Sequence, residues 1–453
     1  MSTPQVPDGR RERARTLRRA ISASAMGNMT EWFDYGVYAY AATYIAKAFF
    51  PSGNDAAATL NTLLVFAVSF VLRPVGGLVL GPIGDRLGRR RVLATTIILM
   101  AGSTFCVGLV PGYASIGLWA PVLLVLLRMV QGFSTGGEYG GAATFMAEYA
   151  PDRRRGFLGS FLEFGTLAGF TLAAAVVLVV ELVIGSSAMQ DWGWRIPFLL
   201  GGPLGLVGLY LRSHLEDTPV FRELEEQDQV EDAATSALKD LLTTYWKPLL
   251  TLGGLVVALN VCNYTLLAYM PTYLKQKIGL SSQSSLVLLI VGQLVMMALI
   301  PFAGRLSDRF GRKPVWWVSL AGLFVAAVPA YVLMAKGFAP ALLGFAILGV
   351  LYVLQLSTIS ATFPAMFPTQ VRFAGFAISY NVFTALFGGT APAVNEKLIA
   401  VTGTDLAPAF SMMAACVVGA VALAFVPETA RASIRGTGVP GVDTEVKPLA
   451  TRR

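Results

Sequence analysis

The chain has 453 residues, of which 55% are hydrophobic and only 14% are charged. Soluble globular domains carry roughly 25% charged residues, so this composition excludes an ordinary soluble protein. The net charge of +8 comes from basic residues scattered over short segments, which argues against a nucleic-acid partner. The three cysteines lie in separate apolar segments without metal or redox spacing, so we expect no cofactor and no metal site.

Long apolar segments recur from one end of the chain to the other. About 20 predominantly apolar residues cross a bilayer as a helix. Repeated runs of this size predict an all-α membrane protein, because lipid offers no hydrogen-bond partners and a helix pairs its own backbone N–H and C=O groups. The segments, about twelve spans in all, are 25–48, 56–84, 92–127 (divided by a turn at 111–113), 129–150, 164–180, 196–211, 248–274, 283–304, 314–335, 337–371, 373–395 and 406–427.

The basic residues predict the orientation of these spans. Of the 35 Lys and Arg, 27 lie in the two tails and in alternate connecting segments, six lie in the opposite segments, and Arg73 and Arg128 lie within spans. The positive-inside rule therefore puts both termini in the cytoplasm of a multi-pass protein of the cell membrane. The expected divisions are a basic tail (1–24), a six-helix bundle (25–211), a cytoplasmic central loop (212–247), a second six-helix bundle (248–427) and a cytoplasmic tail (428–453).

An internal repeat relates the two bundles. The stretch from Gly81 to Arg91 after the second span matches the stretch from Gly304 to Pro314 after the eighth, with Asp85 aligned to Asp308. A second match relates 151–155 to 368–372. We therefore expect 12 transmembrane helices in two pseudo-symmetric six-helix bundles. Carriers built from such repeats bind substrate between the halves and rock them in alternation.

These motifs carry a resemblance to a known family. The paired glycine–aspartate–basic loops resemble the major facilitator superfamily (MFS), and Gly136-Gly137-Glu138-Tyr139 and the stretch from Trp192 to Pro197 resemble its metabolite–proton symporter group. Residues 152–169 carry a closer likeness to the proline/glycine-betaine branch of that group. The resemblance implies proton-driven import of a compatible solute. The short tail after Glu428 lacks the heptads of a coiled coil, so osmotic control through such a coil is not expected.

Ionisable residues within the spans are the candidates for chemistry, because an unpaired charge in lipid is costly. All of those recognised lie in the first half, and the second half is expected to supply neutral contacts. An acid that exchanges an arginine partner for an apolar environment can take up and release a proton. The expected proton-coupling residues are Glu31, Asp34, Glu138 and Glu163.

A zwitterionic solute needs a guanidinium for its carboxylate and aromatic faces for a quaternary ammonium group. Helical spacing puts Glu31, Asp34, Tyr35 and Tyr38 on one face, and Arg128, Gln131, Thr135 and Glu138 on another. The expected substrate-binding residues are Arg73, Arg128, Gln131, Trp32, Tyr35, Tyr38, Tyr139, Asn260, Asn263 and Tyr264.

Each of these assignments has an alternative. The arginines can be structural ion partners of the buried acids, and the aromatic residues can belong to the core or the membrane interface. The glycines of the fourth span can serve helix packing alone, and the two asparagines can be interhelical hydrogen-bonding residues.

The repeated loops are expected to gate the cytoplasmic side, since topology requires basic residues but no aspartate. The gating candidates are Asp85, Arg86, Arg89, Asp308, Arg309 and Arg312.

The resulting prediction is a symporter, not an enzyme, whose partners are a small zwitterion such as proline or glycine betaine, a proton and the lipid bilayer. We expect it to function as a monomer. An organic-acid symporter of the 2-oxoglutarate type and a non-transporting membrane sensor stay open as alternatives.

Overall fold

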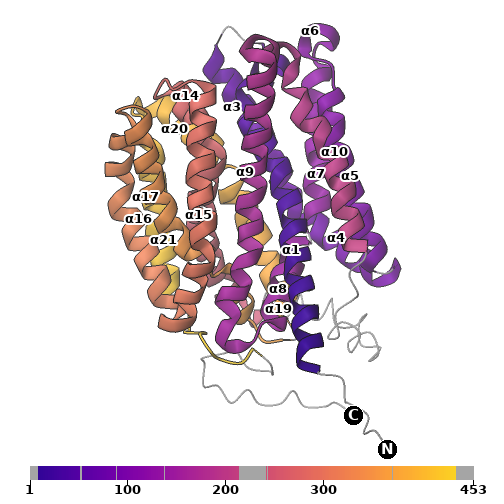
Figure 1. The fold of residues 1–453 in the computed structure, drawn as a ribbon, viewed down its shortest axis with the longest axis vertical. Helices are drawn as coiled ribbons and strands as arrows, with labels where there is room; N and C mark the ends of the chain where they lie inside the picture. Colours follow the sequence, from indigo (N-terminus) through magenta and orange to yellow (C-terminus); the bar gives the residue numbers. More distant parts are fainter. Residues whose placement is uncertain are drawn as a thin grey trace, which may run out of the picture.

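The computed structural model describes residues 9–51, 54–87, 89–136, 138–213, 241, 243–369 and 371–434. Throughout these ranges the regular elements are helices, and no strand occurs in them. By length and composition, eight of the described helices can cross a membrane, and 94–109 and 195–210 form shorter apolar helices. The helices run along the long axis of the molecule (Figure 1).

The first half contains the helices α1 to α10. Its elements are α1 (Gly9–Tyr40), α2 (Ala42–Phe49), α3 (Asp55–Val71), α4 (Arg73–Leu87), α5 (Arg89–Leu109), α6 (Tyr113–Ile116), α7 (Trp119–Thr135), α8 (Glu138–Tyr149), α9 (Arg155–Ala188) and α10 (Arg195–Ser213). Single candidate spans combine α3 with the first part of α4 (Asp55–Leu80) and α7 with α8 (Trp119–Glu148).

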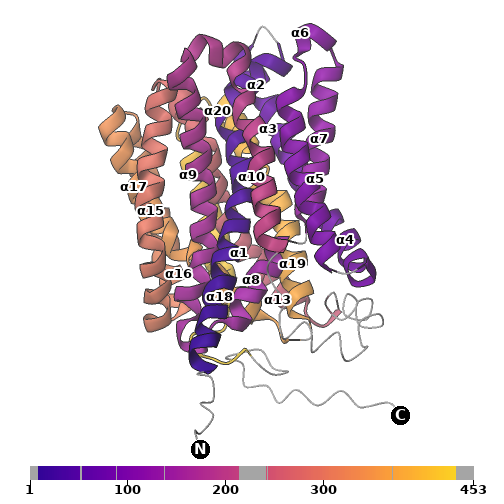
Figure 2. The ribbon, with the colours of Figure 1, turned by 45° about the vertical axis from the view of Figure 1, so that its right-hand side comes forward.

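The second half contains the helices from α13 onward. Its elements are α13 (Trp246–Asn263), α14 (Met270–Gln276), α15 (Ser282–Phe310), α16 (Arg312–Met334), α17 (Phe338–Leu356), α18 (Ile359–Thr362), α19 (Arg372–Phe383), α20 (Ala391–Thr402) and α21 (Ala407–Ala424). Wide π-helical turns, η3 (Tyr264–Tyr269) and η5 (Thr384–Gly388), interrupt two of its spans. The two halves lie side by side, with α9 of the first half against α15 of the second (Figures 1 and 2).

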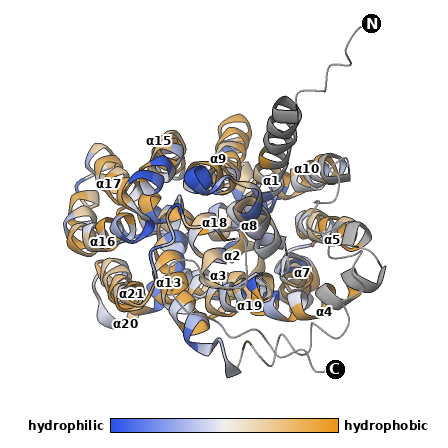
Figure 3. Cartoon of the chain, turned by 90° about the horizontal axis from the view of Figure 1, so that it is seen from below, coloured by the Kyte–Doolittle hydropathy of each residue, from blue (hydrophilic) through white to orange (hydrophobic). Residues whose placement is uncertain are grey.

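The outside of the molecule is apolar, as a lipid-facing surface requires. Large exposed side chains such as Val183, Val325 and Phe425 lie on it. Seen along the helix axes, hydrophilic segments gather at one end near α9 and α15 (Figure 3). This end, where α4 meets α5, is called the lower end below, and the end that carries α6 and α14 is called the upper end (Figure 1).

The structure shows a helix in part of the segment expected to be the N-terminal tail. Helix α1 begins at Gly9, well inside the segment expected to be a tail, because its Arg, Ala and Leu residues favour a helix and no proline interrupts it. The central loop between Ser213 and Leu241 and the tail after Ile434 lie outside the described residues.

Close helix crossings fix the positions of the functional side chains. A Cβ atom on Gly132 would lie 1.7 Å from the carbonyl oxygen of Ser69, and one on Gly136 would lie 2.0 Å from that of Arg73. Only glycine permits α7 to approach α3 and α4 so closely. These contacts bring the segment that carries Arg73 against the helix that carries Arg128.

Candidate functional site

The first buried ion pair joins α1 to α4. The guanidinium of Arg73 donates to Glu31 Oε1 at 2.7 Å and, through Nε, to the hydroxyl of Tyr35 at 3.2 Å. Both charged side chains are 1% exposed. Arg73 at the start of α4 is thus neutralised by Glu31 of α1, a pairing that the sequence left open.

A second buried arginine, Arg128 on α7, has no acid within salt-bridge distance among the described residues. One of its amino groups, Nη1, donates to the side-chain oxygen of Gln131, whose amide donates in turn to Asp34 at 3.1 Å and to Thr104 at 2.9 Å. The guanidinium carbon lies 4.0 Å from the ring centroid of Tyr38. Gln131 therefore links Arg128 to the carboxylate of Asp34.

The remaining donors of Arg128 have no acceptor in the part of the chain that the structure describes. Its Nε and Nη2 atoms are buried and have no hydrogen-bond partner within the described part of the chain. On a guanidinium, Nε and one Nη present parallel N–H bonds, the fork that binds both oxygens of a carboxylate. A buried, charged donor without an acceptor is unfavourable. This fork is therefore suited to an anionic group of a bound ligand.

Aromatic rings surround this region and bridge the two halves. Tyr264 of the second half lies 6.0 Å from Trp32 and 5.1 Å from Phe70, between ring centroids. Phe70 and Phe66 also pack on Tyr35, at 4.8 and 6.1 Å. Trp32, Tyr35 and Tyr264 were expected from the sequence. Phe66 and Phe70 were not, because their position opposite α1 depends on the crossing of α3 with α7.

Glu163 belongs to a separate cluster. Its carboxylate accepts hydrogen bonds from Tyr139 and from Thr166, the latter at 3.0 Å. The ring of Tyr139 stacks on Tyr380 of the second half, with centroids 4.5 Å apart. Tyr139 therefore lies with Glu163 rather than with Arg128. The side chain of Glu138 lies outside the described part of the structure.

The two asparagines bond to helices of their own half. Asn260 donates to Thr384 at 2.6 Å, and Asn263 accepts from Tyr352 at 2.7 Å. These bonds agree with the alternative in which the two asparagines join neighbouring helices by hydrogen bonds. The hydroxyl of the adjacent Tyr264, in contrast, is buried without a hydrogen-bond partner among the described residues.

At the lower end, Asp308 joins the halves. Its carboxylate accepts from the backbone N–H groups of Gly156 and Phe157, both at 2.8 Å, at the N-terminus of α9. Arg312 donates to the same carboxylate at 2.7 Å. A helix N-terminus and a guanidinium both favour a negative charge there. Arg309 is exposed, and the side chains of Asp85, Arg86 and Arg89 are outside the described set.

The segment that follows α21 crosses the same seam, a feature that the sequence analysis missed. Arg155 of the first half donates to the carbonyl of Ala432 at 3.2 Å, and Arg372 of the second half donates to that of Ile434. The side chain of Ile434 is buried against Ala147 and Ala365. One short segment thus contacts both halves.

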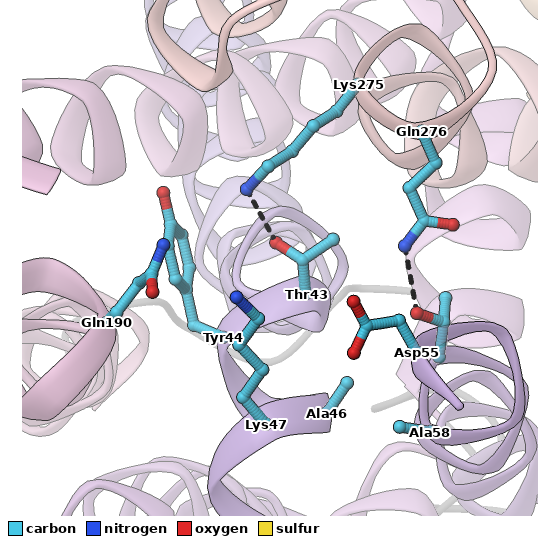
Figure 4. Close-up of a pocket in the computed structure, with 10 residues that line it drawn as sticks. Thr43, Tyr44, Ala46, Lys47, Asp55, Ala58, Gln190, Lys275 and Gln276 are labelled. Carbon is cyan, nitrogen blue, oxygen red and sulfur yellow. Dashed lines mark hydrogen bonds between the residues drawn. The ribbon is translucent and has the colours of Figure 1, made fainter. Parts of the chain in front are cut away.

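Polar contacts also join the halves at the upper end. Lys275 donates to Thr43 at 3.1 Å, and Gln276 donates to Thr59 at 2.9 Å, as the dashed lines in Figure 4 show. Ser282 donates to Glu181 at 2.8 Å.

Two buried acids near this end, Glu181 and Glu396, were not predicted from the sequence. Glu181 lies in α9, and Glu396 lies in α20, where it accepts from Tyr269 at 2.6 Å and from Lys277 at 3.0 Å. The expectation that the second half has no charge within its spans is wrong. The apolar run of the eleventh span stops at residue 395, but α20 continues to Thr402. Tyr269 of the seventh span and Lys277, which follows that span, make burial of Glu396 possible.

Comparisons with known proteins agree with this architecture. The sequence profile of the Major Facilitator Superfamily matches residues 25–393 and, separately, 253–449. A proline/betaine transporter of Escherichia coli (strain K12) is 42% identical over 427 residues, which cover 93% of this chain and 85% of that protein. An ectoine/proline transporter of Corynebacterium glutamicum is 42% identical over 441 residues, covering 95% and 87%.

Among solved structures, that of the proton:xylose symporter XylE bound to 6-bromo-6-deoxy-D-glucose matches with a TM-score of 0.73. The two sequences are 19% identical, and the match covers 92% of this chain and 97% of the other, so the likeness concerns the fold. The family profile, the relatives and the two six-helix halves agree, and the chain is a member of the major facilitator superfamily, a family of membrane transporters rather than enzymes.

Proposed function

We propose that this protein is a proton-coupled symporter that imports a small zwitterion of the proline or glycine betaine type. The observation that carries the proposal is the pair of donors on Arg128 that have no acceptor among the described residues, buried at 1% exposure beside aromatic rings. The relatives named as proline/betaine and ectoine/proline transporters support the same substrate class.

The carboxylate of the solute binds the fork formed by Nε and Nη2 of Arg128. Such a bidentate, charge-assisted pair sets both the position and the orientation of the carboxylate. The rest of the guanidinium is already fixed by Gln131 and by the ring of Tyr38, so little side-chain entropy is lost when the solute binds.

The ammonium group of the solute binds the aromatic cluster of Trp32, Tyr35, Phe66, Phe70 and Tyr264. A quaternary ammonium cannot donate a hydrogen bond, and ring faces attract it through their quadrupoles. Because Tyr264 belongs to the second half and the other four rings to the first, a solute held here touches both halves. Its binding then depends on how the halves are arranged, as alternating access requires.

The number of arginines available to bind a carboxylate in this region favours a zwitterionic substrate over a dicarboxylate. A dicarboxylate requires two available positive groups, and Arg73 is already paired with Glu31 at 2.7 Å. Among the arginines of this region only Arg128 has donors to spare in the described structure. This difference disfavours the organic-acid alternative. The buried acids, which a sensor would not require, disfavour the non-transporting alternative.

Asp34 is the proposed proton carrier that is linked to the substrate. It lies in the membrane region at 2% exposure and contacts Gln131, which also holds Arg128. Binding of a carboxylate to Arg128 changes the charge that Asp34 experiences through this single glutamine, which couples the two events. Glu163, hydrogen-bonded to Tyr139 and Thr166, is a second proton-binding candidate.

The lower end is proposed to face the cytoplasm, since most basic residues lie in the segments that the positive-inside rule puts there. The protein then resides in the cell membrane and works as a monomer, with Asp308, Arg312 and the segment 428–434 closing the cytoplasmic side. From the sequence alone, we also keep Glu138 as a proposed proton-coupling residue and Asp85, Arg86 and Arg89 as proposed gating residues.

A competition panel tests the proposal. Purified protein in proteoliposomes is given labelled glycine betaine and an imposed inward proton gradient, with unlabelled proline, ectoine, choline or 2-oxoglutarate in excess. Proline and ectoine are expected to compete, whereas choline, which lacks a carboxylate, and 2-oxoglutarate, which lacks an ammonium group, are not. In a parallel sample with labelled 2-oxoglutarate, proton-driven uptake of 2-oxoglutarate with no uptake of betaine supports the organic-acid alternative instead.

A further inference from the structure

A polar pocket of about 240 Å³ opens at the upper end, between the two halves. Its walls come from α2 and α3 of the first half and from α14 of the second, and its charged residues are Lys47, Asp55 and Lys275. The ends of these three side chains face the same space (Figure 4). The pocket has room for one molecule the size of proline.

This pocket is separate from the cluster around Arg128, but the nearly continuous helix formed by α1 and α2 contributes residues to both. Thr43 in α2 follows Tyr35 in α1 by eight residues along a nearly continuous helix. At 1.5 Å per residue, the pocket lies about 12 Å above the aromatic cluster, too far for one small solute to occupy both.

Lys275 is an incompletely compensated cation. Its half-buried ammonium donates to Thr43 and lies 4.7 Å from the ring centroid of Tyr44, and it has no carboxylate within salt-bridge distance among the described residues. The nearby Glu181 is occupied by the hydroxyls of Ser186 and Ser282. A neutral hydroxyl is a weaker partner for an ammonium than a carboxylate is.

We propose that this pocket is an outer loading site for the transported zwitterion, with Lys275 and Lys47 holding the carboxylate and Asp55 holding the ammonium end. The inference rests on the proposed function for the identity of the solute. A simple dianion is disfavoured because Asp55 repels it, and a simple cation is disfavoured by the two lysines.

The hydrogen bond between Lys275 and Thr43 also connects binding in the pocket to separation of the two halves at the upper end. The bond from Lys275 to Thr43 is one of the bridges that hold α14 against α2. A carboxylate that pairs with Lys275 competes with the Thr43 hydroxyl for the ammonium group. Loading therefore removes an interhalf bond at the upper end and favours passage of the solute toward Arg128.

The test measures protection of a cysteine introduced into the pocket. Gln190→Cys lines the pocket, and Cys106→Ser removes the exposed native cysteine, while Cys262 and Cys416 are buried. Full-length protein in proteoliposomes is labelled from outside with an impermeant maleimide, with increasing glycine betaine, choline or 2-oxoglutarate. Lys275→Met and Arg128→Met are added separately, and the exposed Lys336→Met is the matched control.

Glycine betaine is expected to slow labelling, and to do so equally in Lys336→Met and Arg128→Met. In Lys275→Met the half-protecting concentration rises about 10-fold, as expected for one charge-assisted hydrogen bond. Protection that is lost in Arg128→Met and kept in Lys275→Met shows that the effect is transmitted from the inner cluster and overturns the inference. Protection by choline or 2-oxoglutarate equal to that by betaine also overturns it, and so does the absence of any protection.

The two proposals can fail separately. If betaine protects the cysteine in the Lys275-dependent manner but the unmodified chain shows no proton-driven betaine uptake, the transport function fails and the outer site stands. If uptake is normal and saturable while the cysteine is never protected, the function stands and the outer site is wrong.

Discussion

Replacing Arg128 by lysine separates the geometry of the guanidinium from its charge. Lysine keeps the positive charge next to Tyr38 and Gln131, but a single ammonium cannot offer two parallel donors to one carboxylate. The substitution therefore removes about one charge-assisted hydrogen bond to the solute, about 1.5–3 kcal/mol, with little solvent screening because the side chain is buried.

That free energy corresponds to a fall of about 10- to 150-fold in kcat/KM for glycine betaine. The loss is expected mainly in KM, because the carboxylate is bound before the halves rock. Initial uptake rates in proteoliposomes under a fixed proton gradient give both constants. Thermal unfolding of the purified variant serves as the control that the fold is intact.

Choline makes the test specific, because it keeps the quaternary ammonium and lacks the carboxylate. The unmodified protein is expected to prefer betaine over choline strongly, and Arg128→Lys and Arg128→Met are expected to reduce this preference by the same factor by which betaine uptake falls. An unchanged preference in a folded Arg128→Met variant would refute the assignment of Arg128 to the carboxylate.

Three further predictions follow from contacts in the structure. Asp34→Asn is expected to abolish proton-driven accumulation of betaine while betaine exchange across the membrane continues, and accumulation at the normal level would exclude Asp34 as the carrier. Asp308→Asn weakens the cap on Gly156 and is expected to increase cytoplasmic labelling of a cysteine introduced along the α9–α15 seam; labelling no faster than in the parent protein would contradict the gate. Gly132→Ala forces a Cβ atom to within 1.7 Å of the Ser69 carbonyl and is expected to lower stability by about 1–3 kcal/mol, seen as a lower midpoint of thermal unfolding; an unchanged midpoint would show that α3 and α7 can separate freely.

The sequence predicted the fold because membrane helices leave strong local signals. Apolar length gives the spans, basic residues give their orientation, and the duplicated Asp85 and Asp308 loops give the two halves. Pairing was not predictable in the same way. Glu31 and Asp34 lie on one face of α1, and only the crossing of α1 with α4 and α7 determines that Arg73 reaches the first and Gln131 the second.

The residues that the sequence analysis missed share a physical reason. Phe66 and Phe70 look like ordinary span residues until the glycine crossing of α3 and α7 turns them toward Tyr35. Glu396 follows the end of an apolar run and becomes internal only because Lys277 lies beside it. The contacts of Ile434 depend on where a segment without periodicity crosses the seam, which no local pattern determines.

The measurement that tests the account most directly is solute-induced proton movement. Proteoliposomes that contain a pH-sensitive dye and have no imposed pH gradient receive external glycine betaine, with the unmodified protein and with Asp34→Asn in parallel. Coupled import predicts acidification of the lumen that follows betaine concentration in the first sample and is absent in the second. Betaine accumulation without acidification, or acidification of equal size in Asp34→Asn, would contradict the central claim that this carrier moves its solute with a proton held by a buried acid.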